Sequence, residues 1–206
     1  MGKLGKLSEK KRLKMESLLN TSFDLFITKG ISKTSVADIA EKAGVAKGTF
    51  YLYFKDKYDI KNRLIRHKSG QLFMSAFEAM QKAGIKAIDD QIVFIVDNIV
   101  DDLERDRALL NFIHKDLSWG MFEDAIASDY STSDNDMNIN LMYREMIKES
   151  GIKLTNPDLM LFTIVELVSS CAYSVITSGS PLPIAEFKPH LYETIRGIIR
   201  QYMVKE

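Results

Sequence analysis

Four side chains in one short N-terminal segment can donate hydrogen bonds and are expected at the outward positions of one helix: Lys47, Thr49, Tyr51 and Tyr53. Phe50 and Phe54, which lie between and after them, are expected to face inward and so turn these donors outward. Phenols on an exposed helix face are unusual unless another molecule covers them. Donors in this arrangement suit the acceptor atoms on base edges in the DNA major groove. The simpler interpretation of Lys47 is a solvated surface lysine.

Two short helices are needed to position these donors. Ser35 and Asp38 have the spacing of a capping box, which predicts a helix that starts there and ends near Gly44. A second short helix is expected over about 46–53. Ala40 is small where the two helices approach each other, and Gly44 supplies the positive φ that a tight turn requires. The layout predicts a helix-turn-helix.

The other segments also have helical periodicity. Residues 15–26 carry an apolar stripe that ends before Gly30, and a long helix is expected from Lys57 toward Met80. No stretch sustains the alternation of a strand, so we predict an all-α fold. The inward positions of the helix-turn-helix are expected to be Ile39, Val45, Phe50 and Phe54. Residues 91–102 and 158–178 are apolar on more than one face, which indicates deep burial or a partner helix.

The net charge of zero conceals an uneven distribution. Residues 1–68 contain 16 Lys and Arg against 7 Asp and Glu, a net of +9, whereas residues 69–206 contain 12 against 21, a net of −9. A basic first third suits a polyanion, and an acidic remainder suits another task. The N-terminal basic residues are expected to form a flexible arm that contacts the DNA backbone without reading bases: Lys3, Lys6, Lys10, Lys11 and Arg12.

The 206 residues are enough for one domain, or for a small domain joined to a larger one, and they include one cysteine, Cys171. A single cysteine excludes an internal disulfide and fits a reducing compartment. The N-terminus has no apolar core of a signal peptide. Residues 159–177 approach the length of a membrane span but contain Glu166, so we expect a buried helix, no membrane association and a cytoplasmic protein associated with the nucleoid.

The helix-turn-helix carries a longer string that resembles the N-terminal domain of the TetR family of bacterial transcriptional regulators. The match covers roughly residues 10–60, and the string is Gly44-Val45-x-Lys47-Gly48-x-Phe50-Tyr51-x-Tyr53-Phe54-x-x-Lys57. The resemblance implies a three-helix, helix-turn-helix DNA-binding domain over 1–55. It also implies a helical ligand-binding and dimerisation domain over 56–206.

The same resemblance implies which residues contact DNA. Thr34 and Ser35 correspond to backbone contacts at the start of the second helix. Base-reading positions correspond to Lys47, Gly48 through its backbone N–H, Thr49 and Tyr51, and the phosphate-clamping positions to Tyr53 and Lys57. Many members have Ser where this chain has Ala46. A methyl group there can make only an apolar contact, for example with a thymine methyl.

The family's C-terminal domain dimerises through its last two helices, which here correspond to residues 158–178 and 186–203. The implied homodimer interface consists of Leu161, Val165, Val168, Ala172, Ile195, Ile198, Ile199 and Tyr202. The alternative is that these residues form an intramolecular core. A two-fold dimer would read the two half-sites of a palindrome.

The resemblance also implies a cavity for a small-molecule inducer, which the sequence does not identify, and no cofactor. Candidate lining residues mix aromatic rings with polar tips: Phe112, His114, Trp119, Phe122, Tyr143 and Tyr173. Each of them is also a plausible core residue. His114 has no second ligand at a helical spacing, so no metal site is expected. The acidic stretch 129–136 lacks the glycine and glutamate of a calcium loop and is interpreted as a solvated linker.

Three functions follow as hypotheses. The first is a dimeric repressor that binds a palindromic double-stranded DNA operator and is released by a small-molecule inducer. The second is a DNA-binding interaction protein of the same fold, without an inducer, whose C-terminal domain docks a protein partner. The third, an enzyme, has little support, because the chain has no G-x-S-x-G, P-loop or H-E-x-x-H motif and Cys171 lies within an apolar run.

Overall fold

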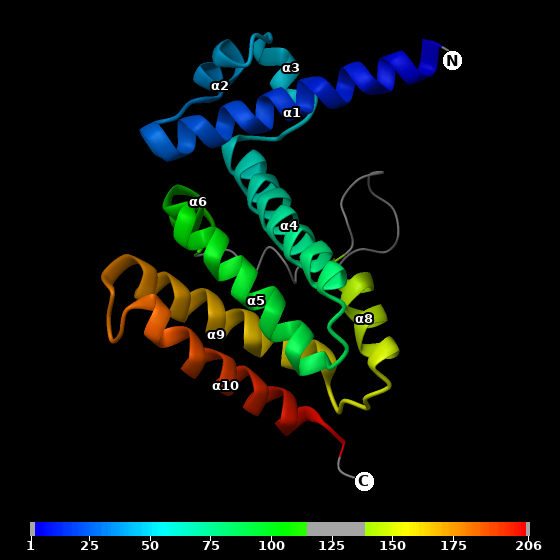
Figure 1. Cartoon of the computed structure of the whole chain (residues 1–206). Helices are drawn as coiled ribbons and strands as arrows, with labels where there is room; N and C mark the ends of the chain where they lie inside the picture. Colours follow the sequence, from blue (N-terminus) through cyan, green and yellow to red (C-terminus); the bar gives the residue numbers. More distant parts are fainter. Residues whose placement is uncertain (1–2, 115–138, 205–206) are drawn as a thin grey trace. The chain divides into compact units, whose positions relative to one another are not determined.

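The computed structural model describes residues 3–114 and 139–204 of the chain. Within these ranges the helices are α1 (Lys3–Lys29), α2 (Val36–Lys42), α3 (Lys47–Tyr51), α4 (Lys57–Ala83), α5 (Ile88–Arg105), α6 (Arg107–Ile113), α8 (Ile139–Ser150), α9 (Pro157–Ser178) and α10 (Ile184–Tyr202) (Figure 1). The described residues form no strand, and their only β-type pairing is an isolated bridge between Leu154 and Met203. The predicted all-α fold is confirmed.

The chain divides into two compact units, residues 1–66 and residues 67–206. The division lies within α4, eleven residues beyond the boundary expected between 55 and 56. Ile60, Leu64 and Ile65 on the first turns of α4 are buried, and they belong to the N-terminal unit. The helix therefore contributes to both units, and a boundary at its first residue would leave part of the N-terminal core out.

The N-terminal unit is a small three-helix arrangement extended by the start of α4. Helix α2 packs against both α1 and α3. Its core contains residues that the periodicity identified, including Leu18, Phe26, Ile39, Phe50 and Phe54, all at most 5% exposed. Val45 is only partly buried. Burial of Phe50 and Phe54 fixes which side of α3 faces away from the core.

The turn between α2 and α3 has the geometry expected of its glycine. Gly44 adopts a φ of +68°, and its N–H donates to the carbonyl of Glu41 at 3.0 Å. The following N–H, from Val45, donates to the carbonyl of Ala40 at 2.9 Å. These two bonds satisfy the last carbonyls of α2 and reverse the chain within two residues.

Helix α1 begins at Lys3 and continues to Lys29. The expectation of a flexible basic arm is therefore wrong, because the basic residues at positions 3–12 lie within the helix. At the other end, Gly30 stops α1 with a φ of +81°, as predicted. Arg12 also pairs with Glu16 one turn later, at 2.6 Å, which is a favourable helical spacing.

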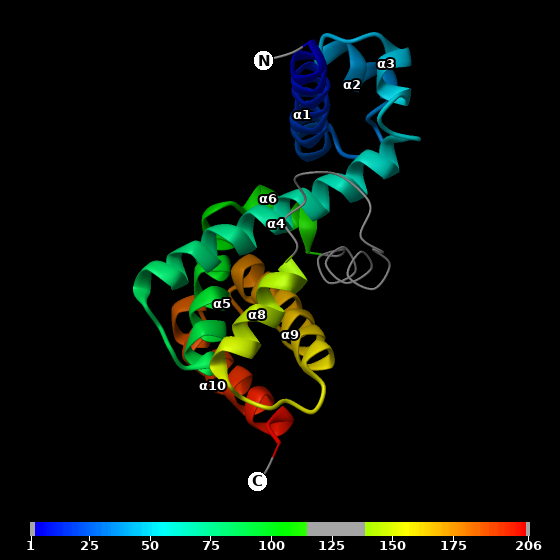
Figure 2. The same ribbon diagram turned by 90° about the vertical axis from the view of Figure 1, so that its right-hand side faces the viewer.

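The C-terminal unit packs its helices around α5 and α9. Helix α10 lies beside α9 in both views (Figures 1 and 2) and also packs against α5. Helix α5 contacts α6, α8 and α9 as well. The core includes Val100, Ile113, Met160, Ala172, Ile195 and Ile199. Both segments that are apolar on more than one face, 91–102 and 158–178, thus provide central helices.

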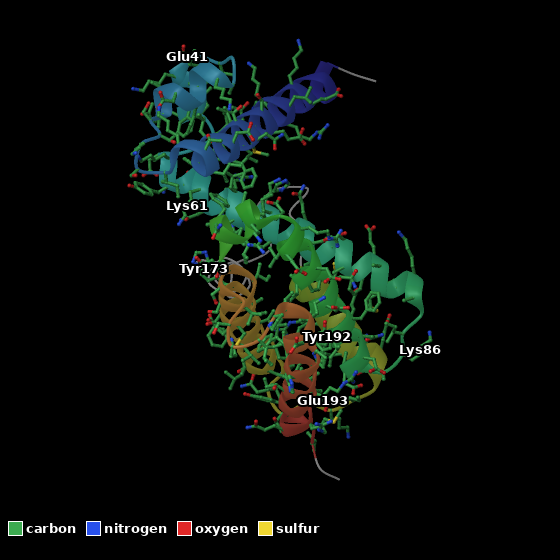
Figure 3. All side chains as sticks on the ribbon, turned by 60° about the vertical axis from the view of Figure 1, so that its left-hand side comes forward. Glu41, Lys61, Lys86, Tyr173, Tyr192 and Glu193 are labelled. Atoms are coloured by element: carbon green, nitrogen blue, oxygen red, sulfur yellow. The ribbon has the colours of Figure 1, made fainter. Side chains whose placement is uncertain are left out.

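A charged network joins α5 to α10. Lys188 donates to Asp97 at 2.7 Å and also pairs with Asp101, and Tyr192 donates its hydroxyl to Asp97. Tyr192 lies next to the exposed Glu193 on α10 (Figure 3). One turn further along α10, Arg196 pairs with Asp89 and Asp90, each at 2.7 Å. The acidic side of α5 therefore holds α10 in place.

Electrostatics within this network favour its charged form. Burial raises the pKa of Asp97, but hydrogen bonds from Lys188 and Tyr192 outweigh it, so the pKa lies below the ordinary value. Burial alone lowers the pKa of Lys188, but its hydrogen bonds to Asp101 and Asp97 raise that pKa by more, so it lies above the ordinary value. Burial and the hydrogen bond to Asp97 together raise the pKa of Tyr192.

Helix α9 is the one described helix that is long and apolar enough, by length and composition, to cross a membrane. Its mean hydropathy reaches 1.9, and a third of that apolar window is buried within the chain. Core helices of soluble proteins pass the same test, and α9 packs against α5, α6 and α10. Burial of Ile164, Ala172 and Val175 agrees with the expected core helix.

Candidate functional site

Helix α3 presents a polar surface at positions 46–49 and 51. Ala46, Lys47 and Gly48 are exposed and Thr49 is partly exposed. Tyr51 is 52% exposed, while the ring of Phe50 packs edge-on against it from the core at a centroid distance of 5.5 Å. The ring of Phe50 thus anchors the helix, and Lys47 and Tyr51 are exposed as expected, whereas Tyr53 lies beyond the end of α3 and is partly buried, with its ring 6.4 Å from that of Phe54.

One neighbouring residue was not anticipated. Leu52 is 81% exposed, directly after Tyr51 at the C-terminal end of α3. A single exposed apolar side chain is normal on a protein surface and does not by itself mark a contact with a partner molecule. The sequence signal for this exposure was that Leu52 does not share the spacing of Phe50 and Phe54, which marks the inward side of the helix.

Ser35 and Asp38 form the predicted capping box. Ser35 Oγ accepts from the N–H of Asp38 at 3.1 Å, and Asp38 Oδ2 accepts from the N–H of Ser35 at 2.8 Å. Lys29 at the end of α1 also donates to Asp38 Oδ2 at 2.9 Å. The bond from Lys29, with those from Ser35, lowers the pKa of Asp38 from 3.8 to about 2. The hydroxyl proton of Ser35 stays available to a phosphate.

Thr34 does not lie where a phosphate contact needs it. Its side chain is 1% exposed, and its hydroxyl donates to the carbonyl of Gly30 at 2.8 Å. The backbone N–H of Thr34 donates to the carbonyl of Ile31 at 3.3 Å. The residue closes the loop between α1 and α2 and supports Ser35 from inside, so we correct the expected contact to a structural role.

Lys57 is also used inside the N-terminal unit. Its Nζ donates to three backbone carbonyls of the loop between α1 and α2, those of Ile31 at 2.9 Å, Ser32 at 3.1 Å and Thr34 at 3.0 Å. An ammonium group has three N–H donors, so all of them are engaged. The expected phosphate clamp is therefore corrected to a clamp on the loop that precedes α2. The sequence pattern could not separate these roles, because both place a lysine at the start of α4.

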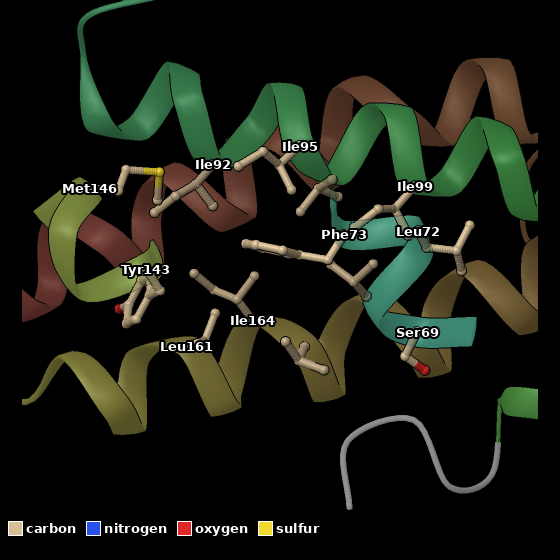
Figure 4. Close-up of a pocket in the computed structure, with 13 residues that line it drawn as sticks. Ser69, Leu72, Phe73, Ile92, Ile95, Ile99, Tyr143, Met146, Leu161 and Ile164 are labelled. Carbon is tan, nitrogen blue, oxygen red and sulfur yellow. The ribbon is translucent and has the colours of Figure 1, made fainter. Parts of the chain in front are cut away.

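The C-terminal unit contains an apolar cavity of about 80 Å³. Figure 4 shows Phe73 projecting between Ile95 and Ile164, with Tyr143 and Met146 at one end of the lining and Ser69 at the other. The lining comes from α4, α5, α8 and α9 and comprises Ser69, Leu72, Phe73, Ile92, Ile95, Val96, Ile99, Tyr143, Met146, Leu161, Ile164, Val165 and Val168. No charged side chain is among them.

One of the candidate ligand residues, Tyr143, lines this cavity. Its hydroxyl donates to the carbonyl of Pro157 at 2.7 Å, and burial, followed by the charge of Asp158, raises its pKa. His114 stacks on Tyr173, with ring centroids 3.7 Å apart, and neither belongs to the lining. Phe112 is partly buried elsewhere. Trp119 and Phe122 lie outside the described residues, as does the acidic stretch 129–136.

The aliphatic lining was not proposed from the sequence, although a signal for it existed. Ile92, Ile95 and Ile99 lie on the segment that is apolar on more than one face, and Leu161, Ile164 and Val165 lie on the other such segment. When a helix has two apolar faces, one face can pack in the core and the other can line a cavity or contact a partner. Of the aromatic and polar candidates that the structure describes, Tyr143 lines the cavity, and Phe112, His114 and Tyr173 do not.

Half of the expected dimer interface is buried within the chain. Val168, Ala172, Ile195 and Ile199 are at most 7% exposed in the single chain, and they pack in the intramolecular core. Leu161 and Val165 line the cavity. Of the expected residues, Ile198 and Tyr202 remain partly exposed outside the cavity. The intramolecular alternative is therefore correct for the buried positions, because α9 and α10 use their most apolar faces to pack on α5 and each other.

Among the described residues, no three His, Cys, Asp or Glu side chains are grouped so that they could hold a metal ion. The free thiol of Cys171 is partly buried on α9. The described residues thus offer an exposed helix rich in hydrogen-bond donors in the N-terminal unit. In the C-terminal unit they offer the apolar cavity and, beside it, a larger and more polar pocket of about 570 Å³ whose lining includes Met146, Glu78 and Glu145. Together with the fold, they define the class of all-helical proteins that join a helix-turn-helix to a separate helical domain.

Comparison with known proteins identifies the family. Residues 18–64 match the family described as bacterial regulatory proteins, tetR family. The chain is 40% identical over 63 residues to the fatty acid metabolism regulator protein of Bacillus subtilis, covering 31% of this chain and 32% of that protein. It is 32% identical over 104 residues to the uncharacterized HTH-type transcriptional regulator YvdT of the same organism, covering 50% and 48%. The chain thus matches less than half the length of these relatives.

Solved structures agree on the fold over most of the chain. The fatty acid degradation regulator FadR of Bacillus halodurans superposes with a TM-score of 0.61 and 17% identity, covering 88% of this chain and 94% of that one. FadR of Bacillus subtilis, solved in complex with stearoyl-CoA, gives 0.56 and 19%, covering 87% and 96%. Residues 18–64 thus match the TetR family of bacterial transcriptional regulators, and the rest of the chain shares the fold of these solved structures. This is a family of DNA-binding transcription factors rather than of enzymes, as expected from the motifs.

Proposed function

We propose that the protein is a ligand-responsive transcriptional repressor that binds a palindromic operator as a dimer and is released by a small-molecule inducer. The observation that carries the proposal is the polar face of α3, which Phe50 anchors from the core and which leaves Lys47 and Tyr51 exposed. A helix with this surface fits a major groove. The basic N-terminal third of the chain supports the same partner, because it attracts phosphates.

The revised contact set is smaller than the one taken from the resemblance. Base edges would be read by Lys47, Thr49 and Tyr51, with the backbone N–H of Gly48 and the methyl group of Ala46 at the start of α3. A lysine there reaches guanine O6 and N7 or a phosphate, and the methyl group suits a thymine methyl. Ser35 and Tyr53 are the side chains proposed for phosphates, while Thr34 and Lys57 hold the loop behind them.

Dimerisation would use the outward faces of α9 and α10, which keep Ile198 and Tyr202 of the expected interface but not its four buried residues. Helix α9 is strongly apolar, yet only a third of its apolar window is buried in one chain. Gly197 lies on α10, and a Cβ added to it would meet no atom within 4 Å, so a partner helix can approach closely there. Ile198 and Tyr202 lie alongside. The variant Gly197→Glu is expected to keep the fold and to shift sedimentation from a dimer to a monomer.

The inducer would occupy the cavity in the C-terminal unit. Ser69, Leu72 and Phe73 reach the cavity from α4, the helix whose first turns belong to the N-terminal unit. A ligand that displaces these side chains would alter α4 and thereby the separation of the two recognition helices in a dimer. The complex of a FadR relative with stearoyl-CoA supports a ligand in this type of domain. A cavity counts against the interaction protein without an inducer. We place the regulator in the cytoplasm.

The test is DNA binding by fluorescence anisotropy on the segment upstream of the protein's own gene, at salt concentrations from 50 to 200 mM. Tight binding that weakens steeply with salt is expected, and Tyr51→Ala should weaken it by at least about tenfold, the range for one specific contact. Lys47→Ala should also reduce the salt slope, whereas Lys86→Ala, an exposed lysine of the other unit, is the matched control. A flat salt response, or full affinity in Tyr51→Ala, contradicts the proposal.

A further inference from the structure

The larger pocket of the C-terminal unit has a lining that indicates the charge of its ligand. It lies between α4, α5 and α8, and its volume of about 570 Å³ is in the range of pockets that hold small molecules. Its lining combines apolar side chains with carboxylates and includes Met74, Phe77, Glu78, Met142, Glu145 and Glu149. We call it the acidic pocket. It differs from the apolar cavity, whose lining has no charged side chain.

The charges of the acidic pocket are not balanced within it. Three glutamates and one lysine belong to the lining, which gives a net charge of −2, and the glutamates are Glu78, Glu145 and Glu149. None of the three forms an ion pair with another described residue, and Arg144 beside them on α8 pairs with Asp158 at 3.0 Å instead. Glu145 and Glu149 lie one turn apart, a spacing at which like charges destabilise a helix. A bound cation would relieve this repulsion.

The acidic pocket also offers apolar surface beside its carboxylates. Met146 lines both the acidic pocket and the apolar cavity, and Figure 4 shows it at one end of that cavity. The ring of Phe77, which lines the pocket, stacks on the ring of Phe73, which lines the cavity, with centroids 6.0 Å apart. A methionine side chain adapts its shape to an incoming group. A ligand can therefore place a charged group near the glutamates and an apolar group against Met146 and Phe77.

We propose that the acidic pocket binds an organic cation, an amine or quaternary ammonium that carries an apolar group, and that Glu145 and Glu149 select for its positive charge. The inference rests on the proposed function, since it names the class of small molecule that the regulator senses. Glu78 lies on α4, so the cation would also lie against the helix that contributes to both units. The same net charge repels anionic head groups, such as that of the stearoyl-CoA bound by FadR of Bacillus subtilis.

The sign of the charge is tested with three probes of similar size and shape: benzyltrimethylammonium, the neutral benzyl methyl sulfone and the anionic benzylsulfonate. Binding to the full-length protein is followed by NMR of the methionine methyl groups. Saturable shifts at Met142 and Met146 are expected with the cation, weaker ones with the sulfone and none with the sulfonate. Equal affinity for the three probes overturns the proposal, as does the absence of saturable binding of the cation.

Selection by the glutamates is tested with Glu145→Gln and Glu149→Gln, which keep the size of the side chain and remove its charge. Both residues are exposed, so these variants are expected to fold, which circular dichroism checks. Each should lower the affinity for the cation about two- to fivefold, the range for an exposed charge pair, and leave the affinity for the sulfone unchanged. Glu186→Gln is the matched control, because Glu186 is an exposed glutamate of α10 outside the pocket. Unchanged affinity for the cation in both pocket variants overturns the role of these glutamates.

The outcomes separate this inference from the proposed function. If the protein binds its operator but not the cation, the ligand class fails and DNA binding stands. If the cation binds and the glutamate variants weaken it, but the wild type does not bind DNA, the proposed function fails and the cation site stands. Tight, saturable binding of stearoyl-CoA that shifts Met142 and Met146 would contradict the ligand class, because that ligand carries charged phosphates.

Discussion

At Lys57, a structural role and a DNA-contacting role lead to clearly different experimental outcomes. Its ammonium group donates to the carbonyls of Ile31, Ser32 and Thr34 at 2.9–3.1 Å. Net contributions of about 1.5–3 kcal/mol are typical for a bond to a charged group, and three bonds that share one partly exposed ammonium are not additive. We therefore expect Lys57→Met to destabilise the N-terminal unit by about 2 kcal/mol, or roughly 30-fold in its unfolding equilibrium.

The assay is urea denaturation followed by helical circular dichroism, combined with DNA binding at several salt concentrations. Because Lys57 uses its hydrogen-bond donors within the protein, Lys57→Met should leave unchanged the slope of the logarithm of DNA affinity against the logarithm of salt concentration. Loss of a phosphate contact lowers this slope by about 0.9 per phosphate. Lys55→Met is the control, since Lys55 is exposed and only its backbone N–H bonds to Asp59. Unchanged stability, or a flattened salt slope, in Lys57→Met would refute the structural role.

Three further predictions concern the described contacts. The lowered pKa of Asp97 means that its contribution to stability is complete above the ordinary pKa near 3.8 and is lost as the pH falls below that value. Asp97→Asn should lower the free energy of unfolding in urea by about 1–2 kcal/mol at pH 7 and should flatten this loss in acid. The exposed Glu193→Gln is the control. The pKa of Asp38 is lowered from 3.8 to about 2, so its contribution to the cap of α2 should persist above pH 3.8 and be lost toward pH 2; an NMR titration with a midpoint near 4 would contradict the capping box. Gly44→Ala should lower stability by about 1–2 kcal/mol, because Gly44 has a φ of +68°; an unchanged melting temperature would argue against this turn.

The helix-turn-helix was predictable because local rules determine it. The spacing of Ser35 and Asp38 predicts a capping box, and Gly44 predicts a left-handed turn. Phe50 and Phe54 predict the buried side of α3. All three features depend on residues close together in the chain. The structure reproduces each of them, so the exposed surface of α3 also follows from the sequence.

The partners of individual polar side chains could not be predicted in the same way. Lys57 bonds to carbonyls 23–26 residues earlier, and Asp97 pairs with Lys188 91 residues later. Such pairs depend on how helices pack, which periodicity does not encode. Lys57 at the start of α4 was therefore expected to contact DNA, although the fold uses it internally.

The cavity shows a different limit. The two segments that are apolar on more than one face were recognised as unusual, and both line the cavity or build the core. Which apolar face packs inside the chain and which faces a ligand or a second chain depends on the other helices. For that reason the expected dimer residues Val168, Ala172 and Ile195 proved to be intramolecular core, and Ser69 gave no signal as an isolated serine in a long helix.

The most direct test of the central claim is selection of binding sites from a random double-stranded DNA library by the full-length protein. The account predicts enrichment of a two-fold symmetric sequence whose half-sites are about one helical turn or a multiple of it apart. Tyr51→Ala should lose this enrichment, while Lys86→Ala, in the other unit, should keep it. Absence of any enriched sequence, or the same symmetric site recovered with Tyr51→Ala, would contradict the claim that α3 reads DNA.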